Sequence, residues 1–323
     1  MKSGEIERVA AAVFYEGYLL YPYRLSVKNV RRWTFGTVSP RFHAEATGEP
    51  EKGRMECQVL LEGNAAVQVK VRFLHVQERT APGSPQPPWQ EGVEREVSLK
   101  VNATASLVEH PERKSFRIPA AHQREAVLDG GGRVVGEVYR LTDELSGVLE
   151  LSAVQVREGL FRLHAKLVNE TGMSDPTDAS QAERRSFMAS HAIVTAEGGR
   201  FVSLTDPPPD KADAARACRH SGWWPVPVGD PAAADAMLCS PIILPDYPRV
   251  AEESPGDLFD GTEIDEILSL RIRSLTDDEK REMASIDPRA RAILERTEAL
   301  ARRELEALHG TWRRFPEIRH DAR

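Results

Sequence analysis

The sequence has few cysteines, no long apolar run and no excess of basic charge. Three cysteines in 323 residues do not make a disulfide framework, which agrees with a reducing compartment. No apolar run approaches the roughly 20 residues needed to span a bilayer, and the acidic start lacks the apolar core of a signal peptide. The net charge of −7 argues against a general nucleic-acid binder, because phosphate contacts need a basic surface. We therefore expect a cytoplasmic protein that binds no nucleic acid and does not insert into a membrane.

The common catalytic motifs are also missing from the sequence. It contains no G-x-S-x-G elbow, no P-loop, no dinucleotide-binding glycine fingerprint and no H-E-x-x-H pair. A catalytic triad assembled from distant residues remains open. The absence of these motifs disfavours an enzyme of the common classes, and no cofactor is expected.

The sequence does contain many short apolar segments separated by turn residues. This pattern of short apolar segments is typical of a mainly β protein, either an antiparallel β-sandwich or a similar sheet-rich body. The pattern predicts an opening strand at 9–15 and short extended pieces at 32–36 and 41–47. Later strands are expected at 94–101, 133–141, 187–191, 192–195 and 200–204.

Two pairs of neighbouring segments predict hairpins. The first joins 55–61 to 66–76, and the second joins 148–156 to 160–168. In the second arm of the first hairpin, apolar and mostly polar residues alternate, so one face should be buried. The residues expected on that buried face are Val67, Val69, Val71, Phe73 and His75.

Three regions that differ in residue composition follow one another along the chain. The β body is expected to span 1–205. It forms one unit or two related halves, 1–128 and 129–205, because both hairpins end in similar sequences, although chance similarity explains this equally well. Residues 206–261 are rich in proline and acidic side chains and predict an extended strap across the body. Residues 262–323 predict a C-terminal helical extension.

The strap and the extension carry local signals for anchoring and for helix starts. The apolar residues 242–244 are expected to anchor the strap. Thr262 predicts the cap of a first helix, residues 276–279 form a capping box, and Asp287 with Pro288 predicts the start of the longest helix. An apolar stripe on that helix packs either on this chain or in a partner's groove. Its members are Ile293, Leu294, Leu300, Ala301 and Leu308.

One group of residues could bind a metal ion. Cys218, His220 and Cys239 supply thiolate and imidazole ligands, which suit zinc, nickel or copper. A fourth ligand would have to come from His191 or Asp230. The alternative is that these cysteines are buried side chains without a metal.

Two segments have the composition of an interaction surface. Tyrosine, tryptophan and arginine dominate interface hot spots, and they are dense near the N-terminus. Core packing with the hydroxyl groups turned outward is the alternative. The candidate contact residues are Tyr18, Tyr21, Tyr23, Arg24, Arg32 and Trp33, with Asp246, Tyr247, Asp257 and Phe259 in the strap. Most carboxylates of the strap are explained by helix starts and solubility, since acid-base catalysis needs a carboxyl group whose pKa is raised by burial.

Several stretches together resemble a family of uncharacterised bacterial proteins encoded near nickel-iron uptake hydrogenase genes. The stretches that carry this resemblance are 15–24, 32–36, 160–171, 199–208 and 240–268. The resemblance implies a role in assembly or maturation of the hydrogenase, with a hydrogenase subunit or maturation factor as the partner. It implies no catalytic residues.

Three hypotheses of function follow. The first is a non-catalytic accessory protein that acts by protein–protein interaction. The second is a metal-dependent or acid-base hydrolase that uses the region 218–266. The third is a self-assembling structural protein, because the sequence leaves the oligomeric state open.

Overall fold

The computed structural model divides the chain into two compact units. The first comprises Met1–Leu20 and Arg31–Arg249, and the second comprises Tyr21–Val30 and Val250–Arg323. The structure describes residues 2–16, 35–82, 89–128 and 131–248 of the first unit. Of the second unit it describes residues 275–277, 280, 281, 284 and 288–299.

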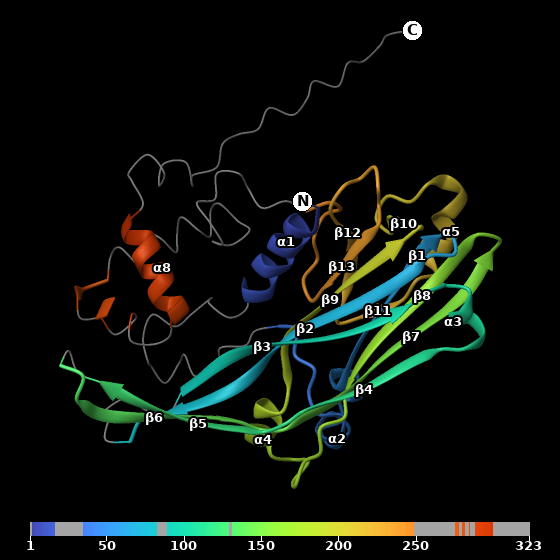
Figure 1. Ribbon diagram of the computed structural model, residues 1–323. Coiled ribbons are helices and arrows are strands. Elements are labelled where there is room, and N and C mark those ends of the chain that lie inside the picture. The colour runs from blue at the N-terminus through green and yellow to red at the C-terminus, as the bar shows by residue number, and fades with distance from the viewer. Residues whose placement is uncertain are drawn as a thin grey trace. The chain divides into compact units, whose positions relative to one another are not determined.

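The first unit is built from two antiparallel sheets (Figure 1). The six-stranded sheet has the order β10 (Arg200–Val202), β1 (Arg54–Glu62), β8 (Leu160–Asn169), β7 (Leu145–Arg157) and β4 (Glu112–Ile118), with β11 (His220–Ser221) also paired to β1. The seven-stranded sheet has the order β12 (Trp224–Pro227), β13 (Ala236–Ser240), β9 (Phe187–Glu197), β2 (Ala66–Thr80), β6 (Val134–Thr142) and β5 (Ala121–Leu128), with β3 (Trp89–Val101) also paired to β2. The prediction of a mainly β, antiparallel fold is confirmed.

The two sheets bury one common apolar core. Alternate side chains of β1, such as Val59 and Leu61, and of β2, such as Val69 and Val71, belong to the same buried cluster. Strands with period-two burial that share a core pack face to face, as in a sandwich. The alternation expected in β2 is confirmed from Val67 to Phe73 and then ends, because Leu74 and His75 are both fully buried. Both sheets contain strands from before and after residue 129, so the segments of both expected hairpins belong to one body.

The first expected hairpin is wrong, whereas the second is confirmed. β1 pairs with β8, β10 and β11, and β2 pairs with β3, β6 and β9. The connection at 63–65 therefore carries the chain from one sheet to the other, and Gly63 at its start has a φ of 92°. β7 and β8 do pair, from Gly147 opposite Asn169 to Arg157 opposite Leu160.

Two segments expected to be extended are helices. α1 (Lys2–Glu16) replaces the opening strand expected at 9–15, and α2 (Arg41–Ala46) replaces the piece expected at 41–47. In α1, Val9, Ala10 and Phe14 are buried at spacings of one, four and five residues, which is one face of a helix. The short apolar run does not distinguish a strand from a buried helix. The other short helices that the structure describes in the first unit are α3 (Ser106–Glu109), α4 (Ala179–Arg184), α5 (Ala212–Arg216), η2 (Pro50–Gly53) and η3 (Pro209–Lys211).

The sheets continue beyond residue 205, where the sequence places the end of the β body. α5, β11, β12 and β13 all lie in the expected strap, and β13 pairs with β9 in the larger sheet. Of the three apolar residues expected as an anchor, Leu244 is buried but Ile243 is 76% exposed. Residues 249–261 lie outside the described residues.

In the second unit, α8 (Pro288–Ala299) begins at the expected proline. Leu294 and Thr297 are buried, and Lys280 forms an ion pair with Glu298 at 2.9 Å. The expected helix start at Thr262 lies outside the described residues, as does the chain after Ala299. No helix among the described residues combines the length and apolar character needed to cross a membrane.

Candidate functional site

The structure separates the three predicted metal ligands. Cys239 on β13 points into the core, where its Sγ lies 3.3 Å from that of Cys57 on β1. Cys218 is buried in a smaller cluster with Leu60, and burial raises the pKa of its thiol to about 11. His220 packs edge-on against Trp224 at 4.5 Å between ring centroids. Within the described parts of the chain, no three His, Cys, Asp or Glu side chains gather as metal ligands would, so the predicted metal site is wrong.

The two proposed fourth ligands also have other roles. His191 is fully buried on β9 beside Phe14 of α1. Asp230 accepts a hydrogen bond from the backbone N–H of Ala232 at 2.9 Å. Both residues therefore help to hold local structure.

The predicted contact residues are described only in part. Asp246 accepts a hydrogen bond from the hydroxyl of Ser203, and the backbone N–H of Tyr247 donates to the carbonyl of Pro227 at 2.8 Å. Burial, and then the charge of Asp246, raise the pKa of Tyr247. Tyr247 has a φ of 52°, so the chain turns sharply there. The predicted contacts that lie outside the described residues are Tyr18, Tyr21, Tyr23, Arg24, Arg32, Trp33, Asp257 and Phe259.

The residues before the segment 17–34 are fixed to strand β9 by α1. The ring of Phe14 meets the ring of His191 edge-on at 4.8 Å between centroids, and both side chains are buried. The guanidinium of Arg72 lies 5.1 Å from the centre of the same Phe14 ring, which is cation–π geometry. Burial lowers the pKa of His191 to about 3, and the charge of Arg72 acts in the same direction.

The residues after the segment are fixed to the same strand. The carbonyl of Gly36 accepts from the backbone N–H of Ser190 at 2.8 Å, and Val38 exchanges two backbone hydrogen bonds with Phe187. Gly36 has a φ of 72°, and a Cβ there would lie 3.0 Å from the backbone of Ala189. A residue with a side chain would therefore be both strained and crowded at this position. The described residues on both sides of the segment, Phe14 before it and Gly36 and Val38 after it, thus meet β9.

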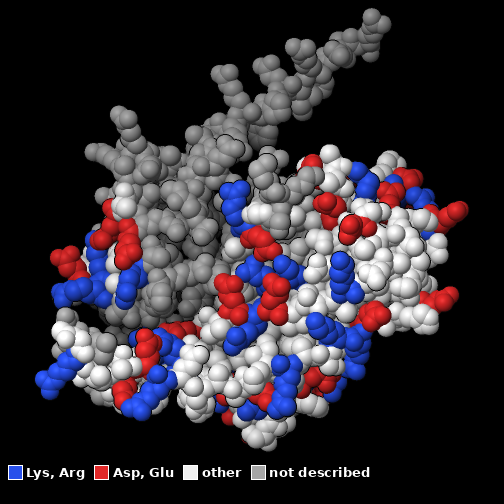
Figure 2. Space-filling view, viewed as in Figure 1, with Lys and Arg blue, Asp and Glu red and all other residues white. Residues whose placement is uncertain are grey.

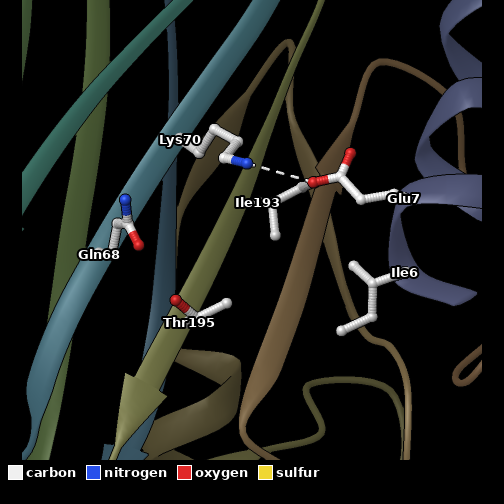
Figure 3. A pocket seen from close by; sticks show the side chains of 6 residues that line it. All are labelled: Ile6, Glu7, Gln68, Lys70, Ile193 and Thr195. Atoms are coloured by element: carbon white, nitrogen blue, oxygen red, sulfur yellow. Dashed lines mark hydrogen bonds and ion pairs between the residues drawn. The ribbon is translucent and has the colours of Figure 1, made fainter. Parts of the chain in front are cut away.

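A groove of about 140 Å³ lies between α1 and the outer face of the larger sheet (Figure 3). Glu7 on α1 is 3.2 Å from Lys70 and 3.2 Å from Arg72, so one carboxylate pairs with two cations of β2. Arg72 is also 2.9 Å from Glu94 on β3. These paired charges orient α1 on the sheet. The residues that line the groove are Ile6, Glu7, Gln68, Lys70, Ile193 and Thr195.

Acidic and basic side chains are mixed over the described part of the face that Figure 2 shows, without a large area of one sign. Ion pairs between neighbouring strands contribute to this mixture. Examples are Lys166 with Glu150 at 3.2 Å and Arg113 with the same Glu150 at 3.3 Å. Such exposed pairs contribute little stability each.

Sequence reasoning did not single out Glu7, Lys70 or Arg72. The outward positions of Lys70 and Arg72 were readable from the alternation in β2. The contact with Glu7 was not, because residues 9–15 were interpreted as a strand. Cys57 was missed for a related reason, since nothing in the sequence places β1 opposite β13.

We expect Glu7→Gln to loosen α1 from the sheet. The change removes the charge that pairs with Lys70 and Arg72, and such partly exposed ion pairs are worth about 0.2–1 kcal/mol. Amide hydrogen exchange in α1 should therefore accelerate roughly two- to fivefold, as measured by mass spectrometry. Glu96→Gln is the matched control, because Glu96 lies 3.7 Å from Lys70 but belongs to β3. Equal exchange in the two variants would contradict this role of Glu7.

Comparison of the chain with protein-family models, with curated proteins and with solved structures finds no match in any of the three. The function is therefore proposed from the geometry and residues of this chain, together with the resemblance described above.

Proposed function

We propose that the protein is a non-catalytic accessory protein that binds another protein through the segment 17–34. The observation that carries this proposal is that the residues on both sides of the segment are held on β9. α1 is held by Phe14 against His191, and the chain after the segment is held by Gly36 and Val38. Connecting segments between ordered elements often carry binding residues.

The composition of the segment supports the proposal. Tyrosine and tryptophan offer large contact areas with few rotatable bonds, and arginine adds directed hydrogen bonds, so these residues dominate the energetics of interfaces. A segment whose two ends are fixed also loses less conformational entropy on binding than a free tail does. The proposed contacts are Tyr18, Tyr21, Tyr23, Arg24, Arg32 and Trp33.

A second contact region is proposed at the end of the β body. Asp246 and Tyr247 lie a few residues after the end of β13 at Ser240, and hydrogen bonds to Ser203 and Pro227 hold this turn. Asp257 and Phe259 are proposed as further contacts on the basis of the sequence alone.

The partner that we propose is a component of a nickel-iron hydrogenase system, either a subunit or a maturation factor. The support is the resemblance to proteins encoded beside uptake hydrogenase genes. The biochemical class, a protein partner, depends on the composition of the segment, whereas the identity of the partner depends on the resemblance alone.

We expect the triple variant Tyr18→Ala, Tyr21→Ala, Tyr23→Ala to lose affinity for the partner. Truncating even one interface hot spot costs about 2 kcal/mol or more, so the dissociation constant should rise roughly 30-fold or more. The measurement is binding of the purified full chain to purified hydrogenase subunits and maturation factors, by calorimetry or biolayer interferometry. Tyr139→Ala is the matched control, because Tyr139 lies on β6 with its hydroxyl bonded to Glu137 at 2.6 Å.

Two outcomes would contradict the proposal. If the triple variant binds as tightly as the unchanged protein, the segment is not the contact surface. If the unchanged protein binds none of the hydrogenase components, the proposed partner is wrong. Light scattering on the same samples gives the mass in solution and so distinguishes an adaptor from a self-assembling protein.

A further inference from the structure

Two thiols from opposite sheets meet in the centre of the sandwich. Cys57 belongs to β1 of the six-stranded sheet, and Cys239 belongs to β13 of the seven-stranded sheet. Their Sγ atoms are 3.3 Å apart, and the two side chains are 1% and 0% exposed. Both are free thiols in this structure. They are 182 positions apart in the sequence, so only the packing of the sheets brings them together.

We propose that Cys57 and Cys239 form a dithiol that is oxidised reversibly to a disulfide between the two sheets. The oxidant is a low-molecular-weight disulfide of the glutathione class. One protein thiolate attacks a sulfur of the oxidised glutathione, which gives a mixed disulfide and releases one glutathione thiolate. The second protein thiolate then attacks the protein sulfur of the mixed disulfide and releases the second glutathione. Two protein thiols are thereby oxidised and one disulfide is reduced.

The geometry favours this pair. A disulfide has an S–S distance near 2.05 Å, so the two sulfurs must approach by about 1.3 Å. The side chains already point toward each other, since the thiol of Cys57 donates to the sulfur of Cys239. The third thiol, Cys218, instead belongs to the smaller cluster with Leu60 and Val202. It therefore serves as an internal comparison.

The buried position of the two thiols also predicts when their exchange with glutathione occurs. The hydrogen bond to Cys239 and then burial raise the pKa of Cys57 well above its ordinary value. A thiol that is rarely ionised and is shielded from solvent reacts slowly. The exchange should therefore proceed while the chain folds or opens, and the closed sandwich should protect whichever redox state it holds.

The test uses the full chain refolded in glutathione buffers of graded oxidised-to-reduced ratio. Remaining thiols are blocked with N-ethylmaleimide, and the protein is digested and mapped by mass spectrometry without reduction. The expected result is a linked peptide pair that contains Cys57 and Cys239, with Cys218 carrying the label. Its yield should follow the glutathione ratio, and unfolding and refolding with dithiothreitol should reverse it.

Oxidation should also change stability. A cross-link that closes a loop of this length restricts the unfolded chain, so the melting temperature of the oxidised protein should be roughly 5–10 °C above that of the reduced protein. Cys218→Ala should keep this difference, whereas Cys57→Ala and Cys239→Ala should lose it. Peptide mapping of the unchanged chain keeps the test valid even if a variant fails to fold. Labelling of all three cysteines at every glutathione ratio, or a disulfide that contains Cys218, would overturn the proposal.

Discussion

Phe187→Ala is expected to lower the free energy of unfolding by about 3–5 kcal/mol, as is typical of a truncated, fully buried phenylalanine. The ring of Phe187 stacks on that of Phe73 at 4.5 Å and tilts against that of Phe116 at 5.7 Å. Gly147 leaves space for this cluster, because a Cβ at that position would lie 2.9 Å from Cζ of Phe187. The truncation therefore leaves a cavity that the surrounding strands cannot close easily. Urea unfolding followed by circular dichroism measures the loss.

Phe42→Ala is the matched control for this experiment. Phe42 is 41% exposed on α2, with the guanidinium of Arg41 at 4.9 Å from its ring. Surface substitutions of this kind usually change stability by about 0.5 kcal/mol or less. Similar losses in Phe42→Ala and Phe187→Ala would show that the cluster around Phe187 is not the centre of the core.

Acidification is expected to destabilise the protein through two buried histidines. Burial, and then the charge of Arg95, lower the pKa of His75 to about 4, while Asp143 acts in the opposite direction. Burial lowers the pKa of His191 to about 3. Both values lie below the value of about 6.5 in an unfolded chain, so the unfolded state takes up these protons first as the pH falls. The stability that neutral His75 and His191 provide is complete above pH 6.5 and is lost progressively below it.

The buried surroundings of the two rings explain why neither accepts a proton easily. Arg95 Nε lies 3.5 Å from Nδ1 of His75, which places the ring nitrogen against a cation. Nε2 of each histidine is buried and has no hydrogen-bond partner among the described residues. One pKa unit corresponds to about 1.4 kcal/mol, so the full effects are roughly 3 kcal/mol for His75 and 5 kcal/mol for His191.

Urea unfolding at a series of pH values from 8 to about 4.5 measures this dependence, in a range where most carboxylates still stay ionised. The double variant His75→Gln, His191→Gln should show a flatter dependence than the unchanged protein, whatever its absolute stability. His122→Gln should keep the original dependence, because His122 is exposed on β5. An unchanged slope in the double variant would contradict the assignment.

Only the amino-acid composition of the candidate site could be predicted from the sequence. The density of tyrosine, tryptophan and arginine in 17–34 is visible in the sequence, and it marks a candidate contact region. The sequence does not predict that the residues on both sides of this segment are held on β9, because Gly36 and Ser190 are distant in the sequence. The predicted group of Cys218, His220 and Cys239 is wrong because closeness in the sequence does not ensure that side chains share a face. Cys239 enters the core while His220 stays at the surface.

Sequence patterns alone predicted the mainly β character, the buried positions of β2 up to Phe73, the hairpin of β7 with β8, and the start of α8 at Pro288. Each of these depends on local periodicity or on local helix-start chemistry, which neighbouring residues encode. Only the tertiary structure decided that β1 and β2 lie in opposite sheets, that 9–15 belongs to a helix, and that Cys57 faces Cys239. Alternation shows which face of a strand is buried, but it does not show which other strand pairs with it or packs against that face. The partner of each strand is selected by packing across the whole body.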